Sequence, residues 1–301
     1  MNLYSELCAI AGGENVLRDE PMSAHTTFRI GGPTDYFVTP GTPEEIAAVT
    51  KLCQSGGIPY YIIGNGSNLL VGDKGFRGVI IQVYKNRNAI RVEGNEVHAQ
   101  AGALLSKVAA AACQAGLAGL EFASGIPGTV GGAVRMNAGA YGGEMKQVLK
   151  CASVLTPQGE VLTLSVDEMK MGYRTSIVSR MDYIVLDAVL TLEPGDEKEI
   201  RAKMEELKEK RVSKQPLEYG SAGSTFKRPE GYFAGKLIQD AGLCGFRVGN
   251  AQVSEKHCGF VINLGGATAA EVVELMDEVV RRVEEESGVR LEPEVKKIGE
   301  F

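Results

Sequence analysis

The chain has 301 residues, of which 44% are hydrophobic and 23% charged, and its formal net charge is −6. This length and composition predict a globular protein of two or three small domains. Acidic and basic residues are interspersed without a basic tail or stripe, which argues against a nucleic-acid-binding surface.

The first residues, "MNLYSELCAI", lack a basic stretch, and no apolar run reaches the roughly 18 residues that a membrane span needs. We therefore expect a cytoplasmic protein that does not enter a membrane. No C-x-x-C pair occurs, and only three histidines accompany the cysteines. This pattern predicts no metal site and no disulfide framework, but free buried thiols at Cys8, Cys53, Cys113, Cys151, Cys244 and Cys258.

The elements expected up to residue 194 are two helices among several strands and hairpins. A helix is predicted over 42–55, where Thr42 is a good N-cap and Glu45 completes a capping box. A second helix is predicted over 103–116, ended by glycine. Strands are expected over 58–63, 78–83 and 183–193, and hairpins over 89–102 and 151–165.

The character of the sequence changes after Pro194. A charged helix is predicted over 196–211, a turn-rich stretch over 213–232 and a short helix over 233–241. A strand over 260–265 precedes a helix over 268–288, which Thr268 and Glu271 would cap. The class is α+β, with breaks near 85 and 194.

The stretch "YIIGNGSNLL" (61–70) places Gly64-Asn65-Gly66 directly after an apolar strand. A Rossmann fingerprint would need a third glycine and an immediate helix, but Leu69 stands at the glycine position and "LLVGDKGFRG" leaves no room for a helix. A Rossmann turn is therefore rejected. Two readings stay open for this stretch, a plain hairpin turn and a nest of backbone N–H groups that binds an anion.

A second glycine-rich stretch, "SGIPGTVGGAVRMNAGAYGGE" (124–144), is too apolar for a linker and too rich in glycine for a regular helix. Glycines at such a place let backbone amides approach a flat ligand closely. The alternative is an irregular buried loop.

Both stretches, together with "YRTS", "GSAGSTFKRP" and "LEPEVKKIG" in the same order, resemble the UDP-N-acetylenolpyruvoylglucosamine reductase family over nearly the whole chain. The resemblance implies a vanillyl-alcohol-oxidase-type FAD-binding fold in two α+β subdomains, expected at 1–85 and 86–194. A substrate-binding α+β domain is expected at 195–301, with its C-terminal segment returning to the active site. The short span from Arg174 to Leu186 resembles the family type that lacks an extra tyrosine-bearing loop.

The resemblance also implies the reaction. NADPH reduces a non-covalently bound FAD, which passes hydride to UDP-N-acetylglucosamine enolpyruvate and gives UDP-N-acetylmuramate for cell-wall peptidoglycan. By resemblance, Ser224 is the proton donor to carbon, Arg174 stabilises the enolate that hydride attack creates, and Glu294 is the carboxylate near the reacting carbons. Glu292 is a near neighbour, and the assignment to Glu294 rests on the E-V-K/R register of the motif. The chain is expected to be a monomer or a weak oligomer.

The binding residues implied by the resemblance fall into two groups. Those for FAD are Ile62, Gly64, Asn65, Gly66, Ser67, Asn68, Leu69, Ser124, Gly125, Ile126, Pro127, Gly128, Thr129, Gly132, Asn137 and Gly139. Those for the substrate are Tyr173, Lys214, Lys227 and Arg228, of which the three cations would form a local anion site in an acidic chain. Arg135 has no assigned role, and the sequence does not distinguish NADPH from NADH. Other readings are a related FAD oxidase that uses dioxygen and a non-catalytic nucleotide-sugar sensor.

Overall fold

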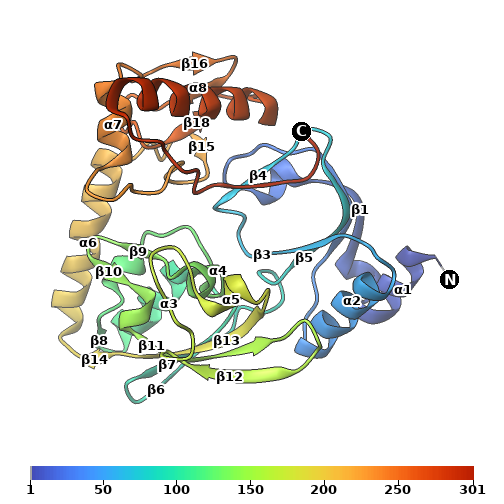
Figure 1. Ribbon diagram of the computed structural model, residues 1–301. Coiled ribbons are helices and arrows are strands. Elements are labelled where there is room, and N and C mark those ends of the chain that lie inside the picture. The colour runs from blue at the N-terminus through green and yellow to red at the C-terminus, as the bar shows by residue number, and fades with distance from the viewer. Residues whose placement is uncertain (1) are drawn as a thin grey trace. The chain divides into compact units, whose positions relative to one another are not determined.

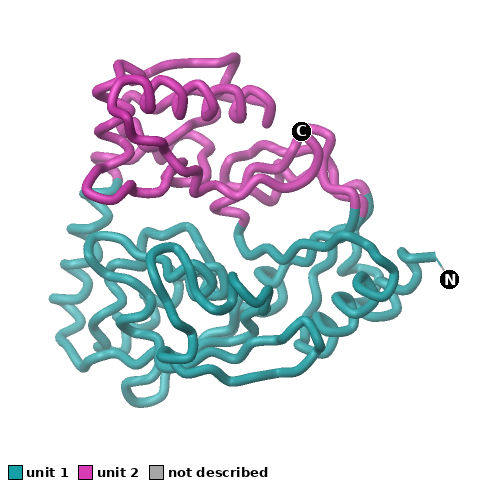
Figure 2. The backbone as a smooth tube through the Cα atoms, viewed as in Figure 1, with its two compact units in different colours: residues 1–18, 36–65, 78–211 teal, residues 19–35, 66–77, 212–301 magenta. Residues whose placement is uncertain are grey.

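The computed structural model describes residues 2–301. The chain divides into two compact units (Figure 2). Unit 1 comprises residues 1–18, 36–65 and 78–211, and unit 2 comprises residues 19–35, 66–77 and 212–301. The division falls inside β1 (Val16–Pro21), β2 (Pro33–Val38), β5 (Phe76–Gln82) and α6 (Glu197–Lys214).

The main sheet of unit 1 has five antiparallel strands in the order β12-β11-β13-β7-β6. Its hairpins are the predicted ones, β6 with β7 and β11 with β12. Buried side chains of α3 and α4 share one apolar core with this sheet. The bounds are β6 (Ile90–Glu93), β7 (Glu96–Gln100), α3 (Leu105–Gln114), α4 (Val130–Met136), β11 (Leu149–Leu155), β12 (Val161–Ser165) and β13 (Ile184–Thr191).

A second core of unit 1 lies between α1 (Leu3–Ala11), α2 (Pro43–Ser55) and the pair β3 (Tyr60–Ile63) and β5. Thr42 caps α2 as predicted, since its side chain accepts a 3.2 Å hydrogen bond from the N–H of Glu45. The Glu45 carboxylate bonds the N–H of Gly41 and not that of Thr42, so the predicted capping box does not form. Smaller elements complete the unit: β8 (Leu117–Ala118), β9 (Gly139–Ala140), β10 (Gly143–Glu144), α5 (Ile177–Arg180) and β14 (Glu193–Pro194).

Unit 2 is built on an antiparallel sheet in the order β15-β18-β17-β16, across which the long helix α8 lies (Figure 1). The predicted capping box of α8 is confirmed, because Thr268 and Glu271 each bond the other's backbone. The bounds are β15 (Gly220–Ser221), α7 (Ala234–Asp240), β16 (Arg247–Val248), β17 (Ala251–Val253), β18 (Val261–Asn263) and α8 (Ala269–Ser287).

The C-terminal segment returns along β4 (Leu69–Val71) (Figure 1). Its strand β19 (Lys296–Ile298) pairs with β4 in parallel, with Lys296 opposite Leu69. Across residues 2–301, no helix combines the length and apolar character of a membrane span.

The six cysteines are all unpaired, but they differ in exposure. Cys53, Cys113 and Cys258 are buried, whereas Cys8 and Cys151 are half-buried. Cys244 is exposed, so the prediction of a buried thiol is wrong there. Cys244 follows α7 in a turn at the protein surface.

Candidate flavin site and active site

The loop from Gly64 to Asn68 joins two strands that do not pair with each other. β3 pairs in parallel with β5, and β4 pairs in parallel with β19. The hairpin reading of Gly64-Asn65-Gly66 is therefore wrong. Residues from Leu69 onward form a strand, which agrees with the rejection of a Rossmann turn.

Within unit 1, the start of this loop lies against the second glycine-rich stretch. The Asn65 side-chain amide donates a 2.7 Å hydrogen bond to the carbonyl oxygen of Pro127. A Cβ atom on Gly64 would lie 2.2 Å from Oγ1 of Thr129, so the approach requires glycine. The structure thus brings together two stretches that lie far apart in the sequence and that both carry predicted flavin contacts.

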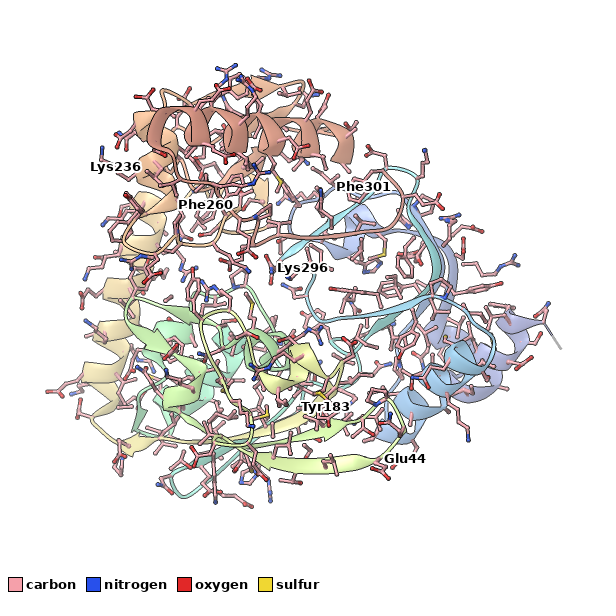
Figure 3. The ribbon with its side chains drawn as sticks, in the orientation of Figure 1. Glu44, Tyr183, Lys236, Phe260, Lys296 and Phe301 are labelled. Atoms are coloured by element: carbon pink, nitrogen blue, oxygen red, sulfur yellow. The ribbon has the colours of Figure 1, made fainter. Side chains whose placement is uncertain are left out.

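Within unit 2, the rest of the loop is fixed by its own neighbours. Gly66 has a φ of +61°, and a Cβ atom there would lie 2.0 Å from the carbonyl oxygen of His25. The side chain of Asn68 bonds the carbonyl of Glu294 at 3.3 Å. The N–H of Lys296, labelled in Figure 3, bonds the carbonyl of Asn68 at 3.0 Å.

Four successive backbone N–H groups of the loop, from Asn65 to Asn68, find no acceptor among the residues that the structure describes. Successive free N–H groups in a turn attract an anion. A cofactor diphosphate supplies oxygen acceptors of this kind, and Gly66 keeps the backbone clear of Cβ atoms at the turn. The loop therefore fits the diphosphate of FAD.

The second glycine-rich stretch contains a helix, which corrects the expectation that it is too rich in glycine for one. α4 runs over Val130–Met136 and is capped by Asn137, whose φ is +46°. Gly131 suits this helix because a Cβ atom there would lie 3.0 Å from the Cβ of Ala101. Burial of Val130 and Val134 in the core of unit 1 outweighs the low helix propensity of glycine.

Several predicted flavin contacts also have structural roles in unit 1. The Asn137 amide donates to the carboxylate of Glu144 at 2.8 Å and to the carbonyl of Gly172 at 3.2 Å. Gly139 lies where a Cβ atom would meet the carbonyl of Gly143 at 2.5 Å. The Ser124 hydroxyl bonds the carbonyl of Glu121. Their contacts with flavin stay predictions, as do those of Ile62, Ser67, Leu69, Ile126, Gly128 and Gly132.

Arg211 is a residue of this region that the sequence did not point to. Its Nε atom lies 2.6 Å from the position of a Cβ atom on Gly125, and its guanidinium lies 5.7 Å from the ring centre of Tyr141. Burial lowers the pKa of Arg211 from its ordinary value. In the sequence Arg211 is one cation among many in a charged helix, so no local signal distinguishes it.

Arg174 sits in a tight turn of unit 1, where Gly172 and Thr175 bond each other's backbone. Its φ of +54° is uncommon for a residue with a side chain. Backbone strain of this kind is concentrated at functional sites. The Arg174 guanidinium lies 5.4 Å from the ring centre of the exposed Tyr173, and the Asn137–Gly172 bond ties the turn to the second glycine-rich stretch.

Arg135 projects from α4, and its guanidinium bonds the carbonyl of Val178 at 3.3 Å. Asp182 lies 3.8 Å away. These contacts give Arg135 a structural role within unit 1.

In unit 2, the segment that carries Ser224 runs antiparallel to the segment that carries Glu294. Phe226 pairs with Pro293, and the N–H of Glu294 bonds the carbonyl of Thr225 at 2.8 Å. Ser224 is exposed and Glu294 is buried. Glu292 is exposed and forms an ion pair with Lys227. The structure thus separates the two carboxylates by environment, which the sequence did not.

The predicted substrate cations have different neighbours in unit 2. The Arg228 guanidinium stacks on the ring of Phe233 at 4.0 Å and bonds the carbonyl of Tyr232. Lys227 pairs with Glu292. Lys214 is exposed at the end of α6.

Two family models match this chain. The FAD binding domain family matches residues 34–165, and the C-terminal domain of UDP-N-acetylenolpyruvoylglucosamine reductase matches residues 215–298. The reductase of Alkaliphilus metalliredigens is 52% identical over 99% of this chain and 98% of its own length. The chain belongs to the UDP-N-acetylenolpyruvoylglucosamine reductase family.

Other members of the reductase family are similarly close. The reductase of Agathobacter rectalis is 56% identical over 95% of both chains. The crystal structure of the Thermus caldophilus reductase superposes with a TM-score of 0.80 at 37% identity, over 94% of this chain and 98% of that one. The 4-ethylphenol oxidase of Gulosibacter chungangensis shares the fold alone, with a TM-score of 0.51 at 15% identity over 96% of this chain and 64% of its own.

Membership of the reductase family confirms what the motifs implied about class. The protein is an oxidoreductase with an FAD-binding domain, and its activity is the family's reductase step in peptidoglycan precursor synthesis. The fold is the predicted α+β, vanillyl-alcohol-oxidase-type architecture with the family's C-terminal domain.

Proposed function

We propose that the protein reduces UDP-N-acetylglucosamine enolpyruvate to UDP-N-acetylmuramate in the cytoplasm, with NADPH as the electron donor and FAD held without a covalent bond. FAD, when bound, supplies the relay of hydride from NADPH to the enolpyruvyl double bond. The observation that carries the proposal is the backbone pairing between the turn that contains Ser224 and the segment that contains Glu294. The Glu294 segment also bonds Asn68, at the end of the loop that begins at Gly64.

Ser224 donates a proton to the substrate carbon next to the one that receives hydride. Ser224 is an exposed residue, which leaves it open to a substrate. The buried Glu294 is the carboxylate that lies beside the reacting carbons, and the bond from its N–H to Thr225 fixes its place next to Ser224. A proton donor that is positioned in this way typically accelerates a step by about 10²–10⁴-fold.

Arg174 stabilises the enolate that forms when hydride reaches the alkene. A guanidinium offers several donors to the two oxygens of a carboxylate. The strained turn fixes the backbone from which this side chain extends. A fixed donor stabilises developing charge without reorganisation during the reaction.

The diphosphate of the substrate is held by Lys214, Lys227 and Arg228, with Tyr173 as a further contact. The three cations belong to unit 2. Lys227 would exchange its ion pair with the exposed Glu292 for a phosphate oxygen, and an exposed pair of this kind costs little to break.

The finer assignments are part of the same proposal. The protein belongs to the type without the extra tyrosine loop, because only the single-turn helix α5 lies between Arg174 and β13. It acts as a monomer or a weak oligomer. Its FAD-binding subdomains span residues 1–85 and 86–194, and its substrate domain spans residues 195–301.

The test is the visible spectrum of the purified protein through one cycle without oxygen. We expect a yellow protein that NADPH bleaches and that the enolpyruvyl substrate recolours. Treatment with acid should release the flavin. Recolouring by dioxygen but not by the substrate would favour an oxidase. A protein that binds the nucleotide sugar but is not bleached would favour a sensor.

A further inference from the structure

A groove of about 730 Å³ lies within unit 2, and none of its lining residues belongs to the flavin, substrate or catalytic assignments. It follows one face of α8, where Ala270, Val273, Asp277 and Arg281 recur at helical spacing. From Ala270 to Arg281 this face is about 16 Å long, at 1.5 Å per residue. The volume falls in the range of ligand sites, about 300–1,000 Å³. The length corresponds to about five residues of extended chain.

The uncharged part of the groove lining is apolar. Phe246, directly before β16, and Val248, within it, are two residues apart, so their side chains point to the same face of the strand. These two residues and Val273 pack against the core of unit 2 but remain half-buried. Phe301, labelled in Figure 3, also lines the groove and is 40% exposed. An apolar side chain of an occupant would remove this surface from water.

One loop of unit 2 fixes two sides of the groove. The N–H of Glu300, next to Phe301, donates to the carbonyl of Gly75 at 2.9 Å, and the N–H of Lys74 donates to the carbonyl of Glu300 at 3.1 Å. The same loop carries Asp73, whose carboxylate caps the N-terminus of α8. The groove is therefore formed before any occupant arrives.

The arginines at the groove already have carboxylate partners. The Glu278 carboxylate accepts a 2.7 Å bond from Arg281 and a 2.5 Å bond from Arg282. Arg281 also pairs with Glu285 at 2.6 Å. These four side chains balance one another in charge.

Two carboxylates of the lining have no cationic partner. Glu274 and Asp277 are exposed, and neither forms an ion pair with any residue from 2 to 301. They are three residues apart on α8 and so lie on the same side of the helix. A cationic occupant is attracted to this side of the groove, and an anionic one is repelled.

We propose that the groove binds an extended, basic segment of a partner protein that carries a large apolar side chain. The apolar side chain would lie against Phe246, Val248 and Phe301, and a lysine or arginine would pair with Glu274 and Asp277. Large buried anchors supply most of the free energy of such binding, and charge complementarity supplies orientation and speed of association. A small cation would leave most of the length of the groove unfilled. The proposal does not rest on the proposed reductase reaction.

The experiment measures the fluorescence anisotropy of labelled peptides that are titrated with the FAD-loaded protein. The probe alternates lysine with leucine over the length of the groove. One comparison peptide has glutamate in place of lysine, and another has serine in place of leucine. We expect the lysine–leucine peptide to bind at least tenfold more tightly than either comparison peptide. Added salt should weaken its binding, because the carboxylates are exposed.

Variants of the groove locate the binding. Glu274→Gln and Asp277→Asn should each weaken binding of the lysine–leucine peptide by about threefold, and this loss should shrink at high salt. Phe301→Ala should weaken binding at low and high salt alike, since it removes apolar surface. Glu286→Gln, which changes an exposed carboxylate of α8 outside the groove, is the matched control and should bind as the wild type does.

Several results would overturn the proposal. They include no binding of the lysine–leucine peptide, equal binding of all three peptides, and binding that none of the groove variants weakens. Displacement of the peptide by an equal concentration of octylamine would assign the groove to a small amphiphilic cation instead. A dimer that Phe301→Ala dissociates in the ultracentrifuge would assign it to a second copy of this chain. None of these measurements uses the reductase activity, so the groove and the proposed reaction are tested separately.

Discussion

The N–H of Glu294 donates a 2.8 Å hydrogen bond to the carbonyl oxygen of Thr225, next to Ser224. Beside it, the N–H of Lys227 bonds the carbonyl of Glu292 at 2.8 Å. The two segments thus form a short antiparallel pair within unit 2. A proposed proton donor and a buried carboxylate are therefore positioned by backbone geometry, independently of the flexible tips of their side chains.

Replacing Ser224 by alanine should separate the two half-reactions. Reduction of the flavin by NADPH needs no proton from Ser224, so bleaching should proceed at the wild-type rate. Recolouring by the enolpyruvyl substrate should slow by about 10²–10⁴-fold, because the general acid is lost. Stopped-flow flavin absorbance measures each half. Ser221→Ala, in the adjacent strand β15, is the matched control and should leave both rates unchanged. Wild-type recolouring by Ser224→Ala would remove Ser224 from the chemistry.

Replacing Glu294 by glutamine tests which of the two neighbouring carboxylates acts. Glu294 is 7% exposed, whereas Glu292 is exposed and paired with Lys227. We expect Glu294→Gln to slow recolouring by the substrate at least tenfold. Glu292→Gln loses only an exposed ion pair, which is worth less than about 1 kcal/mol. The same stopped-flow measurement compares the two variants. A larger effect of Glu292→Gln would reverse the assignment.

Asn65→Ala should weaken flavin binding without unfolding unit 1. The variant loses the 2.7 Å bond to Pro127 that joins the two glycine stretches. A single hydrogen bond contributes about 0.5–1.5 kcal/mol, which corresponds to a loss of roughly 2- to 12-fold in FAD affinity. Titration of the apoprotein with FAD measures this change. Asn88→Ala, which removes only local bonds to the carbonyls of Tyr84 and Lys85, is the control. Equal affinities for the two variants would show that the Asn65 contact does not shape the flavin site.

The helices that the sequence predicted well are those with local signals at their ends. Thr42 and Thr268 each accept the hydrogen bond that their capping positions indicate. The hairpins of unit 1 likewise have turn residues between paired runs. In contrast, the partners of β3 and β4 are distant in the chain, so the sequence around Gly64 could not distinguish a hairpin from a loop between separate strands.

The errors at the site also arise because contacts between distant parts of the chain leave no signal in the local sequence. α4 forms because its apolar side chains are buried against the sheet, and local propensity does not report this burial. Arg211 reaches Gly125 only through the fold. The roles of Ser224 and Glu294 came from family resemblance. What the structure adds is the burial of Glu294, which distinguishes it from the exposed Glu292.

The stability of unit 2 should depend on pH through His257. Burial and the charge of Lys214 lower the pKa of His257 below its ordinary value of 6.5. As the pH falls through this ordinary value, the imidazole takes up a proton in the unfolded chain before it does so in the folded protein. The stabilisation is therefore fully present above about pH 6.5 and declines below it.

Comparison of thermal melting at several pH values tests this prediction. The melting temperature of the wild type should fall more steeply below pH 6.5 than that of His257→Gln. Parallel curves for the wild type and His257→Gln would rule out His257 as the source of the pH dependence.

Asp73 caps the N-terminus of α8 from a loop that lies far away in the sequence. Its carboxylate accepts hydrogen bonds from the N–H groups of Ala269 at 2.7 Å and Ala270 at 2.9 Å, beside the Thr268 capping box. A negative charge and a cap at a helix N-terminus each contribute about 0.5–1 kcal/mol. We therefore expect Asp73→Ala to speed amide hydrogen exchange in the first turns of α8 by roughly tenfold, since 1.4 kcal/mol corresponds to a factor of ten. Exchange in α2 should not change.

Asp277→Ala removes an exposed carboxylate from the middle of α8 and should leave the same amides as protected as in the wild type. Equal protection in Asp73→Ala and Asp277→Ala would show that Thr268 and Glu271 suffice to hold the helix end.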